Sequence, residues 1–243
     1  MSDAIKLEHV YKVFPSPLKT GQFMAALNDI NLRIEQGSFT IIGGANGSGK
    51  SVLMSVIAGL MEPSDGTVTV ASKPGLVFQD AAIQILGDTP REDVAIGPRN
   101  LRRNKNEIPE IVTNALSSVS LLQKADYPAE FLSGGEKRRL AVASILAMDK
   151  EIILFDEPYA NLDYPGIKDV NNLLLKLTNE GKTIILLTHE LEKCLSLANH
   201  FIILQSGKIV FDGSPKEALE KPLEQWSIRN PLVAYNSIED MIW

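Results

Sequence analysis

The sequence is poor in cysteine, since Cys194 is the only cysteine among its 243 residues. A lone cysteine leaves no partner for a disulfide framework, so we expect a protein of a reducing compartment. Positive charge is also in deficit, since 24 lysines and arginines stand against 30 acids and give a formal net charge of -6. This balance argues against a broad electrostatic grip on nucleic acid or anionic lipid, and we expect no nucleic-acid partner. The basic run 137–139 is expected to be a solvated helix face.

Long hydrophobic runs are absent from the sequence as well. The longest apolar stretches, such as Thr183–Leu187 and Phe201–Leu204, have the length of strands, whereas about 18–20 residues are needed to cross a bilayer. Residues 1–4 lack the basic and apolar regions of a signal peptide. If the chain serves a membrane process, we therefore expect it to be peripheral, on the cytoplasmic face of the cell membrane, and held there by a partner.

What the sequence does contain is the composition of a globular domain, with 44% hydrophobic and 22% charged residues. Apolar segments of strand length alternate with helical patterns, which favours an α/β fold with a mostly parallel sheet. Thr67–Val70 alternates like a half-exposed antiparallel strand, Leu7–Val13 is a second candidate of this kind, and Lys208–Phe211 is expected to complete a small hairpin. The strands expected in the parallel sheet are Ser38–Ile42, Leu76–Phe78, Glu151–Phe155, Thr183–Thr188 and Phe201–Leu204.

The stretch from about residue 90 to 148 has a helical pattern, with apolar side chains repeating at helix spacing. Because it interrupts the alternation of strands and helices, we expect a helical subdomain inserted into the core. The length allows one large domain with an insertion, and we take 1–243 as a single domain. The tail at about 221–243 carries aromatic and aliphatic residues, which pack either on the chain's own body or on a twin subunit.

A phosphate cradle with the sequence Gly-Ala-Asn-Gly-Ser-Gly-Lys-Ser lies at residues 44–51, between an apolar strand and an expected helix, Ser51–Leu60. Its glycines let backbone N–H groups converge on phosphate oxygens beside the amino end of that helix. Lys50 would reach the β- and γ-phosphates, and the Ser51 hydroxyl would ligate Mg²⁺. A merely glycine-rich turn is the alternative. The residues expected to bind the nucleotide here are Gly44, Asn46, Gly47, Ser48, Gly49, Lys50, Ser51 and Val52.

Two adjacent acids, Asp156 and Glu157, follow the apolar strand Glu151–Phe155, at the kind of strand end where ligands gather in open α/β sheets. Buried acids are costly without a cation or a task. We expect Asp156 to hold Mg²⁺ and Glu157 to be the catalytic general base for an attacking water. The following Pro158 favours an extended Glu157 whose carboxylate points beyond the strand. For an Asp-Glu pair alone, a solvated turn would be the alternative.

A glycine pair opens a second expected helix in the run Ser133-Gly134-Gly135-Glu136. Ser133 and Glu136 form the pattern of a capping box. A pure cap gains nothing from two glycines, because each weakens a helix interior by roughly 0.5–1 kcal/mol. Bare backbone makes sense where a γ-phosphate must approach a helix amino terminus closely. We therefore expect Ser133, Gly134 and Gly135 both to cap the helix and to bind nucleotide.

Gln79 and His189 each follow an expected strand. Taken alone, each is more typical of a hydrogen-bonded strand end than of a catalytic group. Their order relative to the cradle, the two acids and the glycine pair changes this interpretation. In that combination and order, the chain from Leu7 to Leu219 resembles the ATP-binding-cassette (ABC) ATPases, which are P-loop nucleoside triphosphatases.

The resemblance implies two subunits, identical or different, that close over two ATP molecules. Each nucleotide would lie between the cradle of one subunit and the glycine pair of the other. It also implies that Gln79 contacts Mg²⁺ and water, and that His189 contacts the γ-phosphate region. Asp163, in Asn161-Leu162-Asp163, resembles a D-loop residue of the family that contacts the nucleotide. The adenine would stack on Phe14 or Tyr11, and Phe14 as strand core is the alternative.

Residues 75–85 and 92–101 resemble one branch of the family, the energy-coupling-factor (ECF) ATPases, which also power cobalt- and nickel-type importers. This branch implies a transmembrane scaffold protein and a separate membrane protein that captures the vitamin or transition metal. Between the Gln79 loop and the helical block, where a scaffold would dock, acids either receive its arginines or are solvated loop charges. These acids are Asp80, Asp88, Glu92 and Asp93.

Three other functions share parts of this pattern. A soluble ABC ATPase without a transporter usually fuses two cassettes or adds domains. An exporter, or an importer of another type, would use the same cassette. A regulatory module that binds ATP without hydrolysing it is disfavoured, because both Glu157 and His189 are present.

Overall fold

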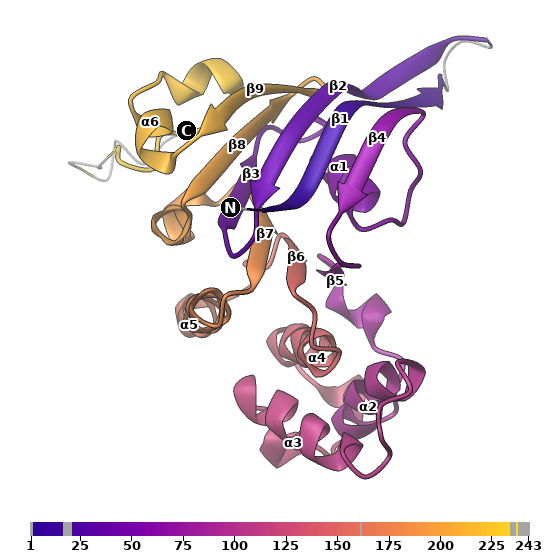
Figure 1. Ribbon diagram of the computed structural model, residues 1–243. Coiled ribbons are helices and arrows are strands. Elements are labelled where there is room, and N and C mark those ends of the chain that lie inside the picture. Colours follow the sequence, from indigo (N-terminus) through magenta and orange to yellow (C-terminus); the bar gives the residue numbers. More distant parts are fainter. Residues whose placement is uncertain (1, 17–20, 161, 234–236, 238–243) are drawn as a thin grey trace.

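The N-terminal part of the molecule is an antiparallel sheet with the strand order β2-β1-β4 (Figure 1). β1 (Asp3–Pro15) pairs with β2 (Phe23–Glu35) on one edge and with β4 (Asp65–Val70) on the other. Side chains along β2 alternate between buried and exposed from Ile30 onward, as expected for a sheet with one face on the core. The structure is a computed structural model that describes residues 2–16, 21–160, 162–233 and 237.

The second sheet has the strand order β5-β6-β7-β3-β8-β9. The five strands β5, β6, β7, β3 and β8 run parallel, and β9 pairs antiparallel with β8. The central strands are buried on both faces, as a parallel sheet covered by other elements requires. The strands are β3 (Phe39–Gly43), β5 (Gly75–Val77), β6 (Ile152–Asp156), β7 (Thr183–Leu187), β8 (His200–Gln205) and β9 (Lys208–Gly213).

Two cores lie on the two faces of this parallel sheet. On one face, α1 (Lys50–Ile57) packs between the two sheets and contributes Leu53 to a core shared with β1 and β2. On the other face, α5 (Tyr164–Asn179) and the inserted helices cover the sheet. Ile41 belongs to the second core and its neighbour Ile42 to the first, which is the two-residue period of a strand.

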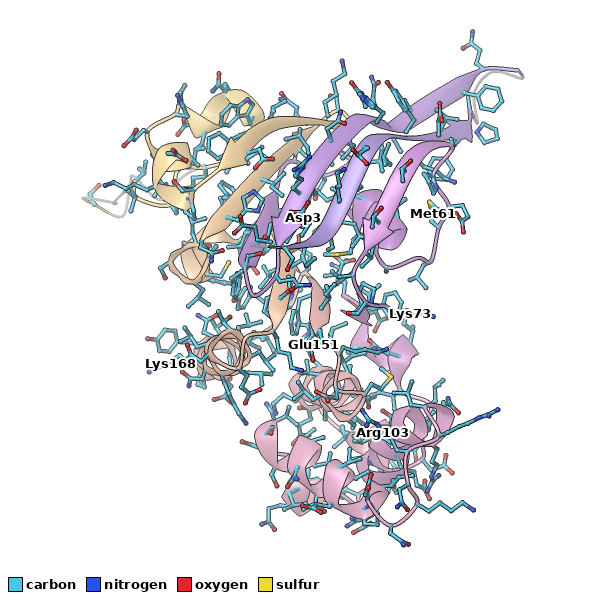
Figure 2. All side chains as sticks on the ribbon, in the orientation of Figure 1. Asp3, Met61, Lys73, Arg103, Glu151 and Lys168 are labelled. Carbon is cyan, nitrogen blue, oxygen red and sulfur yellow. The ribbon has the colours of Figure 1, made fainter. Side chains whose placement is uncertain are left out.

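The helical block consists of α2 (Pro90–Asn100), α3 (Ile108–Ser118) and α4 (Gly134–Ala147), which pack on one another at the end of the molecule opposite the antiparallel sheet (Figure 1). Figure 2 shows Arg103 in this block and Lys168 on the outer side of α5. The remaining helix is α6 (Pro215–Leu219), and short 3-10 helices span Ala81–Gln84, Leu122–Lys124, Ala129–Phe131, Leu191–Lys193, Leu195–Leu197 and Leu223–Trp226.

The architecture confirms the expected α/β fold, with a mostly parallel sheet, an antiparallel N-terminal subdomain and an inserted helical subdomain. The strand β2, however, is not predicted by the sequence pattern. Its buried residues Ile30, Leu32 and Ile34 alternate, but the preceding buried residue, Leu27, is three positions away from Ile30. Asp29 adopts a φ of 55° where the β1–β2 register shifts, and such an irregularity hides the period of two.

None of the helices in the described ranges is both long and apolar enough to span a bilayer. The first part of the expected tail packs on the chain's own body, because Leu223 and Ile228 belong to the second core and the ring of Trp226 lies 5.9 Å from that of Phe211. Residues 234–236 and 238–243, on which the expectation for the tail also rests, lie outside the described residues.

Candidate nucleotide-binding site

The predicted site residues lie at one edge of the parallel sheet. Four neighbouring strands lead into these residues at their carboxyl ends. In spatial order, β5 is followed by Gln79, β6 by the Asp156–Glu157 pair, β7 by His189 and β3 by the cradle at 44–51. Because these four strands are parallel, the four segments start from the same edge. Open α/β sheets bind their ligands at such an edge.

The cradle turns at its glycines, where Gly44, Gly47 and Gly49 have φ angles of 136°, 77° and 106°. A Cβ atom at Gly44 would lie 2.2 Å from the carbonyl oxygen of Leu204, and one at Gly49 would lie 2.4 Å from that of Ala26. Packing against β8 and β2 therefore requires glycine at these two positions. At Gly47 a Cβ atom would meet no described atom within 4 Å, so the backbone conformation alone requires glycine there.

Lys50 begins α1, and its side chain is buried against the cradle. Its Nζ donates hydrogen bonds to the carbonyl oxygens of Gly44, at 2.8 Å, and Ala45, at 3.0 Å. Burial lowers the pKa of Lys50, and the carboxylates of Glu157 and Asp156 oppose this shift. The ammonium group thus lies between the cradle and the acidic end of β6, where an added anion would favour its charged form.

The donors and acceptors around Lys50 fit a polyphosphate with Mg²⁺. The first N–H groups of a helix have no carbonyl partner within it, and here they belong to the residues that follow the cradle glycines. The Oγ atom of Ser48 is buried without a hydrogen-bond partner in the described parts of the chain. Ser51 and Asp156 offer the oxygen ligands that Mg²⁺ prefers. Asn46 and Ser51 are exposed, and Val52 is half-buried.

Asp156 and Glu157 differ in backbone conformation. Asp156 ends β6, and its pKa is raised by burial and by the adjacent Glu157. The prediction that Pro158 keeps Glu157 extended is wrong, because Glu157 has a φ of 47°, in the left-handed region. Its N–H donates to the carbonyl of Leu187 at 2.9 Å, so a hydrogen bond to β7 overrides the local preference. Such strain costs on the order of 1–3 kcal/mol and is found most often at functional sites.

The carboxylate of Glu157 is buried, with one oxygen paired and one not. Oε1 lies 2.9 Å from Nδ1 of His189, whose ring is 63% exposed. Oε2 is buried and has no partner within the described residues. A buried acceptor of this kind calls for an explanation, and an incoming proton donor such as a water molecule supplies one.

Gln79 lies two residues beyond β5, and its side chain is exposed. The turn before it is fixed by Gln84, whose Oε1 accepts from the N–H of Phe78 at 3.1 Å and whose Nε2 donates to the carbonyl of Leu76 at 3.0 Å. Gln84 thereby pairs with the outer edge of β5 as a neighbouring strand would. The sequence pattern alone indicates no role for Gln84, although this residue lies in the ECF-like stretch 75–85.

The glycine pair begins α4 and is capped as predicted. Ser133 Oγ accepts from the N–H of Glu136 at 3.2 Å, and Glu136 Oε2 accepts from the N–H of Ser133 at 2.9 Å. A Cβ atom at Gly134 would meet nothing within 4 Å among the described residues, and one at Gly135 would make an ordinary contact with Leu162 at 3.7 Å. The chain's own packing therefore does not require glycine at either position.

Asp163 caps α5, since its Oδ1 accepts from the N–H of Gly166 at 3.0 Å. This contact neither supports nor opposes the predicted role of Asp163 at the nucleotide. Asn161, the first residue of the D-loop-like run, lies outside the described residues.

Phe14 is half-buried and belongs to neither core of the described chain, so the alternative that it is a core residue is wrong. It pairs with Met24 of β2, two residues before Ala26, whose carbonyl lies against Gly49 of the cradle. Tyr11 is about as near in register, because Ala26 lies between Leu27, the partner of Lys12, and Ala25, the partner of Val13. The end of β1 that carries Phe14 thus lies beside the cradle, and Phe14 as the stacking ring remains a proposal.

Two charged residues that the sequence pattern assigned to the surface are buried. Arg138, in the basic run, is only 8% exposed, so the expectation of a solvated helix face is wrong at the centre of this run.

Asp93 is also buried, with 4% of its surface exposed. One of its carboxylate oxygens accepts hydrogen bonds from the N–H groups of Leu86 (2.7 Å) and Gly87 (3.0 Å), and the other accepts one from Ser144 Oγ (2.6 Å). Asp93 is fully engaged within the chain, so the hypothesis that it receives a partner's arginine is wrong.

Comparison with known proteins points to one family. The profile of the ABC transporter family matches residues 27–160, more than half of the chain. The energy-coupling factor transporter ATP-binding protein EcfA of Carboxydothermus hydrogenoformans is 35% identical over 247 residues, covering 96% of this chain and 89% of the relative. The protein EcfA2 of Methanospirillum hungatei is 40% identical over 208 residues, covering 79% of this chain and 52% of the relative. The chain thus spans about half the length of this second relative.

Solved structures agree with the sequence comparison. The structure of cbiO1 from Clostridium perfringens, described as part of the ABC transporter complex cbiONQ, has a TM-score of 0.80 and 30% identity, with 91% of this chain and 92% of that chain covered. The ATP-binding cassette MJ0796, in a dimeric post-hydrolysis state bound to ADP and Pi, has a TM-score of 0.78 and 28% identity, with coverages of 87% and 98%.

A phosphate cradle on a central strand, an acid pair two strands away and a capped glycine pair on an inserted helical block together define an ATP-binding cassette, an α/β P-loop ATPase fold. The chain belongs to the ABC transporter family. Within that family, curated relatives at 35–40% identity are named energy-coupling factor transporter ATP-binding proteins.

Proposed function

We propose that the chain is the ATP-hydrolysing motor subunit of an ECF-type membrane importer, and that two cassettes close over two ATP molecules. The observation that carries this proposal is the glycine pair at the start of α4, which the chain's own packing does not require. A bare helix amino terminus suits a phosphate that arrives from outside. A second cassette, of the same or a different sequence, would bring that phosphate. The dimeric cassette with ADP and Pi is a relative that supports this arrangement.

Binding would begin at the cradle. Lys50 and the first N–H groups of α1 would hold the β- and γ-phosphates, with Phe14 beside the adenine. Ser51, Asp156 and Gln79 would hold Mg²⁺, which when bound neutralises charge on the phosphates. The raised pKa of Asp156 supports this assignment, because a nearby cation would favour its ionised form.

Hydrolysis would use Oε2 of Glu157, which has no partner among the residues that the structure describes. This oxygen would accept a proton from the water that attacks the γ-phosphate in line. His189 keeps the other carboxylate oxygen engaged at 2.9 Å, and its exposed ring is free to contact the γ-phosphate region. Ser133 and Gly135 of the opposing cassette would complete the site from the other side.

ATP drives closure only through its higher affinity for the closed pair. Moving a 1:99 balance between closed and open forms to 99:1 takes about 5.5 kcal/mol. In this proposal, two nucleotides, each bridged between a cradle and a glycine pair, would supply this energy. Cleavage of the γ-phosphate would remove the bridge and let the pair reopen.

A docking surface for a membrane partner is proposed beside the helical block. A cavity of about 480 Å³ is lined by Ala82, by residues 85–88 and 128–130, and by Lys137. Around it, Ile83, Leu86 and Phe131 are 69%, 76% and 68% exposed. Apolar side chains in such a setting suit a partner. The partner would be a transmembrane scaffold protein, and a separate membrane protein would capture a vitamin or transition metal. The chain would then lie on the cytoplasmic face of the membrane.

Changing Leu86 to aspartate should abolish co-purification of an integral membrane protein with the chain from detergent-solubilised membranes. The 76% exposed side chain contributes little to the core, so folding and the ATPase activity of the isolated chain should be unaffected. Leu60→Asp is the matched control, since Leu60 is 61% exposed but lies just beyond α1, away from this cavity. Equal recovery of membrane protein with both variants would count against the importer.

Changing Gly135 to alanine should stabilise the free chain and yet slow ATP turnover by tenfold or more. Alanine in a helix is favoured over glycine by about 0.5–1 kcal/mol, and its Cβ atom makes only an ordinary contact here. In a closed pair the same methyl group would lie where the opposing phosphate approaches. Thermal unfolding and steady-state turnover of the one variant measure both effects.

The control for Gly135→Ala is Ser117→Ala, which improves an exposed position of α3 without touching the site. This control should raise stability slightly and leave turnover unchanged. If Gly135→Ala instead kept the wild-type turnover, the glycine pair would not meet a phosphate, and the two-cassette proposal would be lost.

A further inference from the structure

Arg138 lies in the second turn of α4, with its guanidinium buried between three segments of the chain. Nη1 donates to the carbonyl oxygen of Pro158 at 3.1 Å and also to that of Ala160. Nη2 donates to the carbonyl oxygen of Gln79 at 2.9 Å. One cation therefore joins α4 to the segment after β5 and to the turn after β6; α4 also contacts β5, which pairs with β6 (Figure 1).

The partners of Arg138 are unusual for a buried cation. Within the described residues the hydrogen-bond acceptors of its guanidinium are backbone carbonyls, and Nε has no partner. Burial lowers the pKa of Arg138, and the carboxylates of Asp80 and Glu190 oppose this shift. Buried charges are usually paired with an opposite charge or a metal, whereas here the direct partners are carbonyl groups. A planar fork that binds carbonyls from two separate turns instead fixes the distance between those turns.

Each of these turns carries a residue of the proposed reaction. Pro158 to Ala160 follows Glu157 directly, and the N–H of Ala160 donates back to the carbonyl of Glu157 at 3.2 Å. The strained φ of Glu157 is therefore part of the same turn that Arg138 holds. The carbonyl of Gln79 belongs to the residue proposed to contact Mg²⁺ and water. The helix that supplies Arg138 begins with the glycine pair.

We propose that Arg138 is a positioning residue that locks Gln79 and Glu157 to the glycine-bearing helix, so that a movement of α4 on closure is passed to the water-activating carboxylate. This inference rests on the proposed ATP hydrolysis. Arg138 touches neither the nucleotide nor the water in this role; it acts through the turns at Gln79 and Glu157. Its loss should therefore affect the rate of the chemical step rather than the grip of the cradle on ATP.

The test is Arg138→Lys, with Arg138→Gln as a second variant. Lysine keeps the charge but is a point donor that cannot reach three carbonyls in a fixed plane. Both variants should lower kcat by tenfold or more while KM and the ATP dissociation constant stay within about threefold, since the contacts of Lys50 are unchanged. Arg91→Lys is the matched control, because Arg91 also makes a two-pronged contact, at 2.7 and 2.9 Å, but with the exposed carboxylate of Asp126.

Hydrogen–deuterium exchange supplies a readout that does not need hydrolysis. Arg138→Lys should raise amide exchange in peptides covering both Gln79 and Ala160, and Arg91→Lys in neither. If the wild-type chain fails to hydrolyse ATP while this exchange result holds, the proposed function fails and the structural link stands. If turnover is present and the two Arg138 variants lose activity only in proportion to their unfolded fraction, or exchange rises at neither segment, the positioning role is overturned.

Discussion

Replacing Glu157 by glutamine should lower ATP turnover by about 10²–10⁴-fold while leaving ATP binding intact. The amide has the size of the carboxyl group and can keep a hydrogen bond to His189, so the left-handed turn and its bond to Leu187 should persist. What it loses is the ability to take up a proton at the buried position of Oε2. With binding intact and cleavage blocked, the closed pair should accumulate.

Turnover by phosphate release and mass by light scattering check this expectation for Glu157→Gln. With ATP and Mg²⁺ the variant should have the mass of two cassettes, and with ADP that of one. Glu151→Gln is the matched control, because Glu151 lies just before the amino end of the same strand, β6, and pairs with Lys182 at 3.0 Å. A Glu157→Gln variant that kept more than a tenth of the wild-type rate would exclude Glu157 as the general base.

The sequence predicts those parts of the site that are formed by residues close together in the chain. The cradle needs only a strand, three glycines and a helix start within residues 39–57, and Gln79 and His189 follow strands that their apolar runs reveal. Parallel strands then bring their carboxyl ends to one edge whatever the details of packing. The capping box of Ser133 and Glu136 is likewise local, and its two hydrogen bonds confirm the prediction.

What the sequence does not predict depends on distant partners. Arg138 is buried because carbonyl groups 20 and 59 residues away accept its hydrogen bonds. Asp93 is buried because a loop and α4 supply its donors, one of them 51 residues away. Glu157 departs from the preference set by Pro158 because β7 offers a carbonyl. In each case a contact made only in the folded chain outweighs a local tendency.

Replacing Lys50 by alanine should weaken ATP binding by at least a hundredfold. A hydrogen bond to a charged group contributes about 1.5–3 kcal/mol, and each 1.4 kcal/mol is a factor of ten in affinity. Here the ammonium group also offsets the charge of two nearby carboxylates, Asp156 and Glu157. Without it, a triphosphate would meet uncompensated negative charge at the end of β6. Calorimetric titration with ATP and Mg²⁺ measures the loss.

The Lys50→Arg variant separates the charge of Lys50 from its shape. Arginine keeps the positive charge, but its planar fork cannot take the place of a single ammonium that donates to the carbonyls of Gly44 and Ala45 at 2.8 and 3.0 Å. If charge alone mattered, Lys50→Arg would bind ATP as the wild type does. If the contact with the two carbonyl oxygens matters as well, the affinity of Lys50→Arg should fall between those of the wild type and Lys50→Ala. Unchanged affinity in Lys50→Ala itself would refute the assigned cradle. The intermediate result is expected, because Lys50 is buried and donates to both carbonyl oxygens, a geometry that the larger planar guanidinium does not match.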